Sequence, residues 1–235
     1  MRCRATFAFA VAGLLICPAI ASAQSQPGAG SETGSLIKRA PAVVVDGRSL
    51  TAAREATRQF GACVVSRRPV FAVRVMQMPV DDPEFSKLMK RLASDECMAD
   101  GSLTVPILLF RTAVFEAAYL KEFGKSPPED LKLAPVVDYT VGYSAPLTST
   151  AAVTIALGRM GDCVARADSK AAHFLVTSRP GTALENDAFS VLLKPLPACV
   201  VKGETVRISK PVVRGAIVEA LYRIRQGQGL QGAKP

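Results

Sequence analysis

The chain has 235 residues, of which 49% are apolar, and 29 basic against 20 acidic side chains give it a formal net charge of +9. It has no tryptophan and four tyrosines, so aromatic platforms for stacking nucleic-acid bases are scarce and no nucleic-acid partner is expected. Its length suffices for two domains of about 100 residues each after removal of an export signal.

Residues 1–23 are predicted to be a signal peptide. Arg2 and Arg4 supply its positive start. An apolar run from Ala5 to Ile16 follows, and the small residues Ala21-Ser22-Ala23 form a cleavage site. The run is too short for a permanent membrane anchor. We therefore expect a periplasmic or secreted protein with no transmembrane segment after cleavage.

Cleavage after Ala23 leaves a chain with four of the six cysteines and a net charge of about +7. A lipoprotein signal would need a small residue directly before its cysteine. Ile16 precedes Cys17, which disfavours lipidation. The composition of residues 24–36, rich in Ser, Gly, Gln and Pro, predicts a flexible tail at the start of the processed chain.

The rest of the chain is predicted to be a tandem repeat. Gly61-Ala62-Cys63-Val64 returns one hundred residues later as Gly161-Asp162-Cys163-Val164. The stretch Arg111–Tyr119 returns as Arg214–Tyr222, with five of nine positions identical. Self-similarity at one period indicates two copies of a single structural unit. The predicted organisation is a first helical repeat over residues 37–123, a linker over 124–131, a second helical repeat over 132–226 and a flexible C-terminal tail over 227–235.

Each repeat is predicted to hold about four helices, so the expected fold class is all-α with minor short extended segments. Capping residues and prolines place the first three helix starts in each repeat. These starts lie after Ser49 and Ser149, at Pro69 and Ser169, and after Asp82 and Asn186. The first helix is expected to run to the Gly-x-Cys-Val motif.

The prolines of Lys194-Pro195-Leu196-Pro197 are expected to stop the third helix early in the second repeat. Short extended pieces follow at residues 103–105 and 206–208. The fourth helix spans about residues 106–123 and 211–225. It is apolar on most of its circumference, which predicts the central buried helix of each unit.

The four cysteines of the processed chain are predicted to form two disulfides. An even number of cysteines in an exported chain is typical of a disulfide framework, although three connectivities are available. Because each copy should fold in the same way, the repeat favours Cys63–Cys97 and Cys163–Cys199. A metal site is disfavoured, since the chain has one histidine and no Cys-x-x-Cys spacing. No cofactor is expected.

The fourth helix carries the best candidate for a polar site. At 100° per residue, a tyrosine projects between an arginine and a glutamate on one face of the helix. A functional interpretation is a pocket in which arginine binds an anion while glutamate or tyrosine handles a proton. The alternative is a structural set of buried polar groups, which recurrence in both repeats favours. The residues are Arg111, Glu116 and Tyr119, and Arg214, Glu219 and Tyr222.

Other signals of chemistry are weak. His173, the single histidine, corresponds to Val73 and is interpreted as a packed or surface residue. No nucleophile-elbow or phosphate-loop motif is present. The scattered basic residues are interpreted as a solvated surface, with an anionic envelope polymer or lipid headgroups as the alternative partner. They are Arg54, Arg58, Arg67, Arg68, Arg74, Lys87, Lys90 and Arg91.

Gly-x-Cys-Val, a second cysteine and the helix Arg214–Tyr222 together resemble a set of uncharacterised exported bacterial proteins with the same duplicated pattern. The resemblance covers most of residues 50–225, and Thr112 and Ala118 depart from the motif. It implies no activity, because the set has none assigned.

Three functions are therefore expected, in decreasing order. The first is a non-enzymatic binding or structural protein of the bacterial envelope. The second is an enzyme without a readable motif that uses a cleft between the repeats. The third is a weak binder of anionic polymers. A cleft with arginine, glutamate and tyrosine pointing into it would favour the enzyme, and a contiguous basic face would favour the polymer binder.

Overall fold

The computed structural model describes residues 47–94, 97, 106–200 and 208–232. The predicted signal peptide, the predicted tail over residues 24–36 and the extended piece over residues 103–105 lie outside this part, as do residues 206 and 207. Within the described part, all regular secondary structure is helical, which confirms the all-α prediction. None of its helices is long and apolar enough to cross a membrane.

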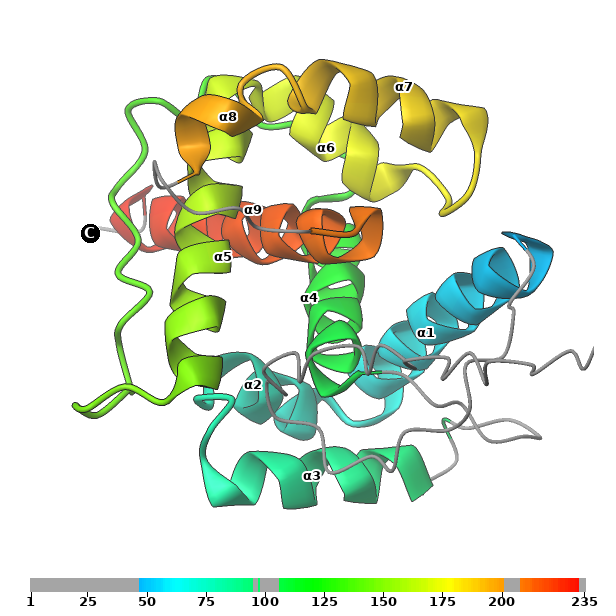
Figure 1. Ribbon diagram of the computed structural model, residues 1–235, viewed down its shortest axis with the longest axis vertical. Coiled ribbons are helices and arrows are strands. Elements are labelled where there is room, and N and C mark those ends of the chain that lie inside the picture. Colours follow the sequence, from blue (N-terminus) through cyan, green and yellow to red (C-terminus); the bar gives the residue numbers. More distant parts are fainter. Residues whose placement is uncertain (1–46, 95–96, 98–105, 201–207, 233–235) are drawn as a thin grey trace, which may run out of the picture. The chain divides into compact units, whose positions relative to one another are not determined.

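The helices fall into two series along the chain (Figure 1). The first series is α1 (Gly47–Arg67), α2 (Pro69–Gln77), α3 (Pro83–Ser94) and α4 (Ile107–Phe123). The second is α5 (Ser149–Ala167), α6 (Ser169–Thr177), α7 (Ala183–Leu192), the short α8 (Leu196–Cys199) and α9 (Lys210–Gly232).

Several boundaries differ from those expected. Helix α1 begins at Gly47 rather than after Ser49, and α7 begins at Ala183 rather than after Asn186. The side chain of Thr182 caps α7 by accepting from the Glu185 amide at 3.3 Å. The cap therefore lies at Thr182 and not at Asn186.

The helix ends differ as well. Helices α1 and α5 run past Gly-x-Cys-Val to Arg67 and Ala167. The proline-rich stretch after α7 forms the short helix α8, because proline is tolerated in a first helical turn. Helix α9 continues to Gly232, so the predicted flexible tail from residue 227 is wrong over the first part of its length.

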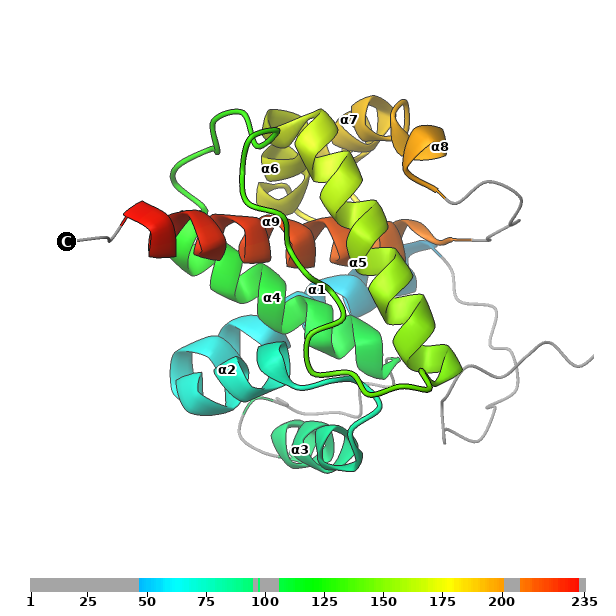
Figure 2. The ribbon, with the colours of Figure 1, turned by 90° about the vertical axis from the view of Figure 1, so that its left-hand side faces the viewer.

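Helices α4 and α9 cross at the centre of the helical body, and the other helices pack around them (Figures 1 and 2). The central position matches their composition, since both are apolar on nearly every side. Helix α1 packs against α4, and α5 packs across α9 (Figures 1 and 2). The prediction that these two helices are the most buried is therefore confirmed.

The glycine of each Gly-x-Cys-Val motif is required by the closeness of that packing. A Cβ atom on Gly61 would lie 2.2 Å from the carbonyl oxygen of Ala113 in α4. A Cβ atom on Gly161 would lie 2.2 Å from the carbonyl oxygen of Ala216 in α9. Only glycine allows the backbones to approach so closely.

Where α4 and α9 cross, a glycine of one helix packs against a larger residue of the other. A Cβ atom on Gly215 of α9 would lie 2.6 Å from Cγ2 of Thr112 in α4. The two positions correspond in the predicted repeats, so the threonine that departs from the motif fills the space that its glycine counterpart leaves open.

Both predicted disulfides are confirmed. Cys63–Cys97 joins α1 to the chain beyond α3, with Cα atoms 5.5 Å apart. Cys163–Cys199 joins α5 to α8, with Cα atoms 5.6 Å apart. Each bridge closes a loop of about 35 residues, which stabilises a fold by roughly 3–4 kcal/mol.

The connection between α4 and α5 is held against α5 over residues 131–135. Arg166 of α5 donates to the carbonyl oxygens of Leu131, Ala134 and Pro135 at 2.7–2.9 Å. The side chain of Leu131 is fully buried. The predicted linker over residues 124–131 therefore contributes to the core at its end.

Candidate functional site

Arg214 of α9 is the centre of the polar interior. The residue is buried, with 4% of its surface exposed. Nη2 and Nε donate to the two carboxylate oxygens of Glu116 in α4, at 2.8 and 3.3 Å. Nη1 donates to Glu185 of α7 at 3.1 Å. One arginine therefore joins two carboxylates from two other helices.

The same guanidinium also binds the end of α6. It donates to the carbonyl oxygens of Leu175, Val176 and Ser178 at 2.7, 3.1 and 2.9 Å. Carbonyl groups in the last turn of a helix have no partner within the helix, and that end carries partial negative charge. Arg214 supplies both the missing donors and the positive charge.

Two further arginines lie at the outer ends of this cluster, both from α1. Arg58 donates from Nε to Glu116 at 3.0 Å. Arg54 donates to both oxygens of Glu185. The resulting five-residue ion chain alternates in sign in the order Arg58, Glu116, Arg214, Glu185, Arg54. Its two end side chains are 22% and 16% exposed, whereas the inner three are below 10%.

A second, shorter chain lies around Arg111 of α4. Nη1 of Arg111 donates to Glu219 of α9 at 2.5 Å, and Arg223 donates to the other oxygen of Glu219 at 2.9 Å. Arg111 also donates to the carbonyl oxygens of Val75 and Met76 near the end of α2, at 3.4 and 3.3 Å. In this three-residue ion chain, Arg111 contacts the end of α2 as Arg214 contacts the end of α6.

The arginine of each central helix thus pairs with the glutamate of the other central helix. Arg111 does not pair with Glu116, and Arg214 does not pair with Glu219. The expected single polar face, with both charges and a tyrosine from one helix, is not formed. The charged residues instead join the two halves of the chain.

The tyrosines of the expected face lie elsewhere. Tyr119 is fully buried, and its hydroxyl lies 2.8 Å from Nδ1 of His173. Tyr222 donates to Glu122 at 3.3 Å. Burial raises the pKa of both tyrosines to about 12. Burial, and then the positive charge of Arg225, lowers the pKa of His173. Neither tyrosine is suited to give up a proton near neutral pH.

The pKa of Glu185, inside the five-residue ion chain, depends on two opposing effects. Burial by itself raises that pKa. Hydrogen bonds from Arg54 and the Gly181 amide, together with the charges of Arg54 and Arg214, outweigh the effect of burial. The pKa of Glu185 is therefore lowered, and the carboxylate stays ionised inside the protein.

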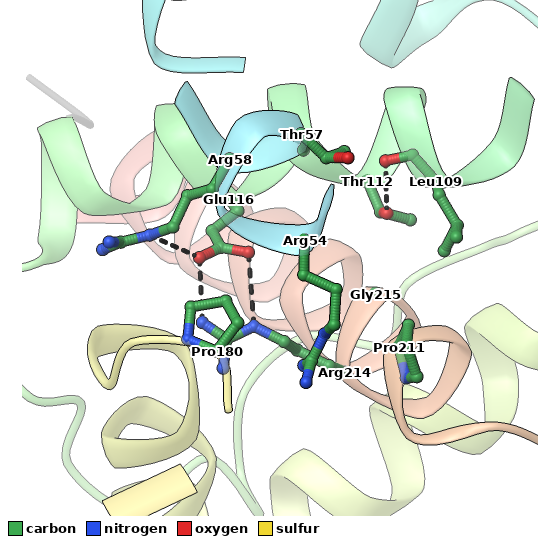
Figure 3. Close-up of a pocket in the computed structure, with 11 residues that line it drawn as sticks. Arg54, Thr57, Arg58, Leu109, Thr112, Glu116, Pro180, Pro211, Arg214 and Gly215 are labelled. Carbon is green, nitrogen blue, oxygen red and sulfur yellow. Dashed lines mark hydrogen bonds and ion pairs between the residues drawn. The ribbon is translucent and has the colours of Figure 1, made fainter. Parts of the chain in front are cut away.

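A small hollow of about 60 Å³ opens beside the five-residue ion chain (Figure 3). Arg54, Arg58, Glu116 and Arg214 line it, and dashed lines in Figure 3 mark the bonds that Glu116 accepts. No tyrosine lies at its wall. In the described part of the chain every buried side-chain nitrogen and oxygen has a hydrogen-bond partner. The arrangement is thus suited to hold helices together.

Sequence reasoning missed some residues of the five-residue ion chain and of the three-residue ion chain. Arg54 and Arg58 were expected on a solvated surface, and Glu185 and Arg223 were not singled out. Glu185 is 1% exposed, although its neighbours Leu184 and Asn186 are exposed. A spacing of four places Arg54 and Arg58 on one face of α1, but nothing in that spacing identifies the carboxylates they meet.

The other basic residues stay on the outside. Arg74 of α2 and Lys87 and Lys90 of α3 are exposed, and Lys87 donates to Glu84 at 2.7 Å. Across the residues that the structure describes, no group of three or more acidic, histidine or cysteine side chains is placed to hold a metal ion.

No family model, no curated protein and no solved structure matches the chain.

Proposed function

We propose that the protein is an exported, non-enzymatic component of the bacterial envelope with a binding or structural role. The paired disulfides support export, since such bonds persist in oxidising compartments. The pattern of charge, apolar run and small residues in residues 1–23 supports it as well.

One observation carries the non-enzymatic part of the proposal. The charged side chains that the sequence predicts as a site form ion pairs between the two central helices. A general acid or base must be able to reach a substrate proton, and a nucleophile must be open to attack. The chemistry of this interior favours a rigid scaffold.

Fractionation of the producing cell followed by intact-mass analysis tests the proposal. The expected product lies in the envelope or the medium, begins at Gln24 and is lighter by four hydrogens than the reduced chain. A reduced product in the cytoplasm that keeps residues 1–23 would contradict export. An added lipid at Cys17 would contradict the cleavage site.

A further inference from the structure

A hollow of about 440 Å³ lies between α2, α4, α9 and the connection that leads to α5. Pockets that bind small molecules are commonly of about 300–1,000 Å³ and mostly apolar. Its wall includes Met76 of α2, Phe115 of α4, the segment Pro135–Val137 and Ile224 of α9. The size and lining are those of a site for an apolar group.

The rim of the hollow exposes apolar surface. Val73 of α2 is 45% exposed and Val136 of the connection is 94% exposed, and both line the hollow. Burying such side chains against a ligand removes apolar surface from water and so stabilises a complex. The hollow therefore offers hydrophobic binding energy that the fold leaves unused.

A positive charge lies at the same wall. Arg223 donates from Nε to Glu219 at 2.9 Å and from Nη2 to the carbonyl oxygen of Met76 at 3.3 Å. Its guanidinium lies over the ring of Phe115, 5.4 Å from the centroid. The three-residue ion chain holds two arginines and one glutamate, so this ion chain has a net positive charge. The carboxylate of Glu122 bonds to Tyr222 and Gln226 at another part of the lining. An anionic group would be attracted to the wall at Arg223.

Comparison of the predicted repeats identifies three positions at which the residues of the hollow leave more space or add a positive charge. In the corresponding place, His173 bonds to the buried Tyr119, and the Phe123 ring lies 5.7 Å from the ring of Tyr119. At the hollow, Arg223 takes the position of Leu120 and Gln226 takes the position of Phe123. Val73 takes the position of His173. At the corresponding place the described side chains of Tyr119, His173 and Phe123 contact one another, whereas the hollow is open and carries the cation of Arg223.

We propose that this hollow binds a small amphipathic anion, with an apolar chain along the exposed Val73 and Val136 and a carboxylate at Arg223. The proposal rests on the binding role proposed above and names the class of ligand. It does not depend on export, because the site is complete in the folded chain.

Calorimetric titration of the purified, oxidised mature protein tests the site. The probes are decanoate, decanol as the uncharged analogue and acetate as the anion without a chain, each below its aggregation concentration. Decanoate is expected to bind saturably with one site per chain. Decanol is expected to bind at least about tenfold more weakly, and acetate not to bind, because chain and charge both contribute.

Variants separate the two contributions. Arg223→Leu, which introduces the residue of the corresponding position, should weaken decanoate about tenfold and leave decanol unchanged. Gln226→Phe should fill the hollow and weaken both probes. Val70→Phe, at a position of α2 that is 71% exposed and outside the lining, is the control and should change neither. Circular dichroism melting establishes that each variant is folded.

Equal affinity for decanoate and decanol, or an unchanged decanoate affinity in folded Arg223→Leu, would overturn the assignment of the anion to Arg223. Lack of saturable decanoate binding, or unchanged binding in folded Gln226→Phe, would overturn the site itself. Neither result would bear on export, which the mass and fractionation experiment tests separately.

Discussion

A buried arginine stabilises a fold only when its charge is paired and its donors are used, because removal of the ion from water costs several kcal/mol. Arg214 meets this condition with two carboxylates and three carbonyl oxygens from α6 and the residue after it. Arginine is the side chain that supplies five N–H donors in a fixed fork, and the six bonds of Arg214 use all three of its nitrogens.

Arg214→Ala should lower the free energy of unfolding by about 3–5 kcal/mol, because Glu116 and Glu185 lose a buried counter-charge. Urea unfolding followed by circular dichroism measures the loss. Lys87→Ala is the control. Its ion pair with Glu84 is exposed and screened by solvent, so little change in stability is expected. A loss at Arg214 no larger than that of the control would contradict the structural role.

The lowered pKa of Glu185 makes part of the stability depend on pH. An unfolded glutamate has a pKa near 4.5, and the folded value is lower, so the contribution of the carboxylate is complete above pH 4.5. It is lost as the pH falls through the lowered, folded-state pKa. Glu185→Gln should therefore be less stable than the parent at pH 7, and the difference should shrink below pH 4.5.

Urea unfolding at several values between pH 7 and the acid limit of folding measures this convergence. Glu84→Gln, at an exposed position, serves as the control and should differ from the parent by less than about 0.5 kcal/mol throughout. A difference between parent and Glu185→Gln that stays constant with pH would contradict the assigned ionisation.

Among the elements, the helix pairs α1–α4 and α5–α9 are set by single glycines. Gly61→Ala should lower the free energy of unfolding by about 1–3 kcal/mol, since the added methyl group meets backbone that must shift. Gly227→Ala in α9 is the matched control. Nothing lies within 4 Å of its added Cβ, so alanine should stabilise the helix by up to about 1 kcal/mol. Similar effects of the two substitutions would contradict the close approach at Gly61.

The sequence was sufficient to predict most helices and both disulfides, because these depend on local signals that occur twice. Pro69 and Pro83 mark helix starts where proline is favoured, and the apolar run of α4 marks a buried helix. The start of α7 was missed because Asn186 and Thr182 are both acceptable caps, and packing of Glu185 decides between them.

At the scale of the molecule, the partners of the charged residues were beyond the sequence. The pattern Arg-x4-Glu-x2-Tyr places the three side chains on a helix, but the crossing of α4 and α9 determines which carboxylate each arginine meets. Loss of Arg111 is therefore expected to affect Glu219 on the other central helix. We expect this crossed pairing to make the two halves unfold as one cooperative unit.

A double-mutant cycle on urea-unfolding free energies tests the crossed pairing most directly. It compares Arg111→Ala with Glu219→Ala, its partner across the crossing, and with Glu116→Ala on its own helix. The crossed pairing predicts a coupling energy of about 1–3 kcal/mol between Arg111 and Glu219, and less than about 0.5 kcal/mol between Arg111 and Glu116. A larger coupling within the helix than across the crossing would contradict the account.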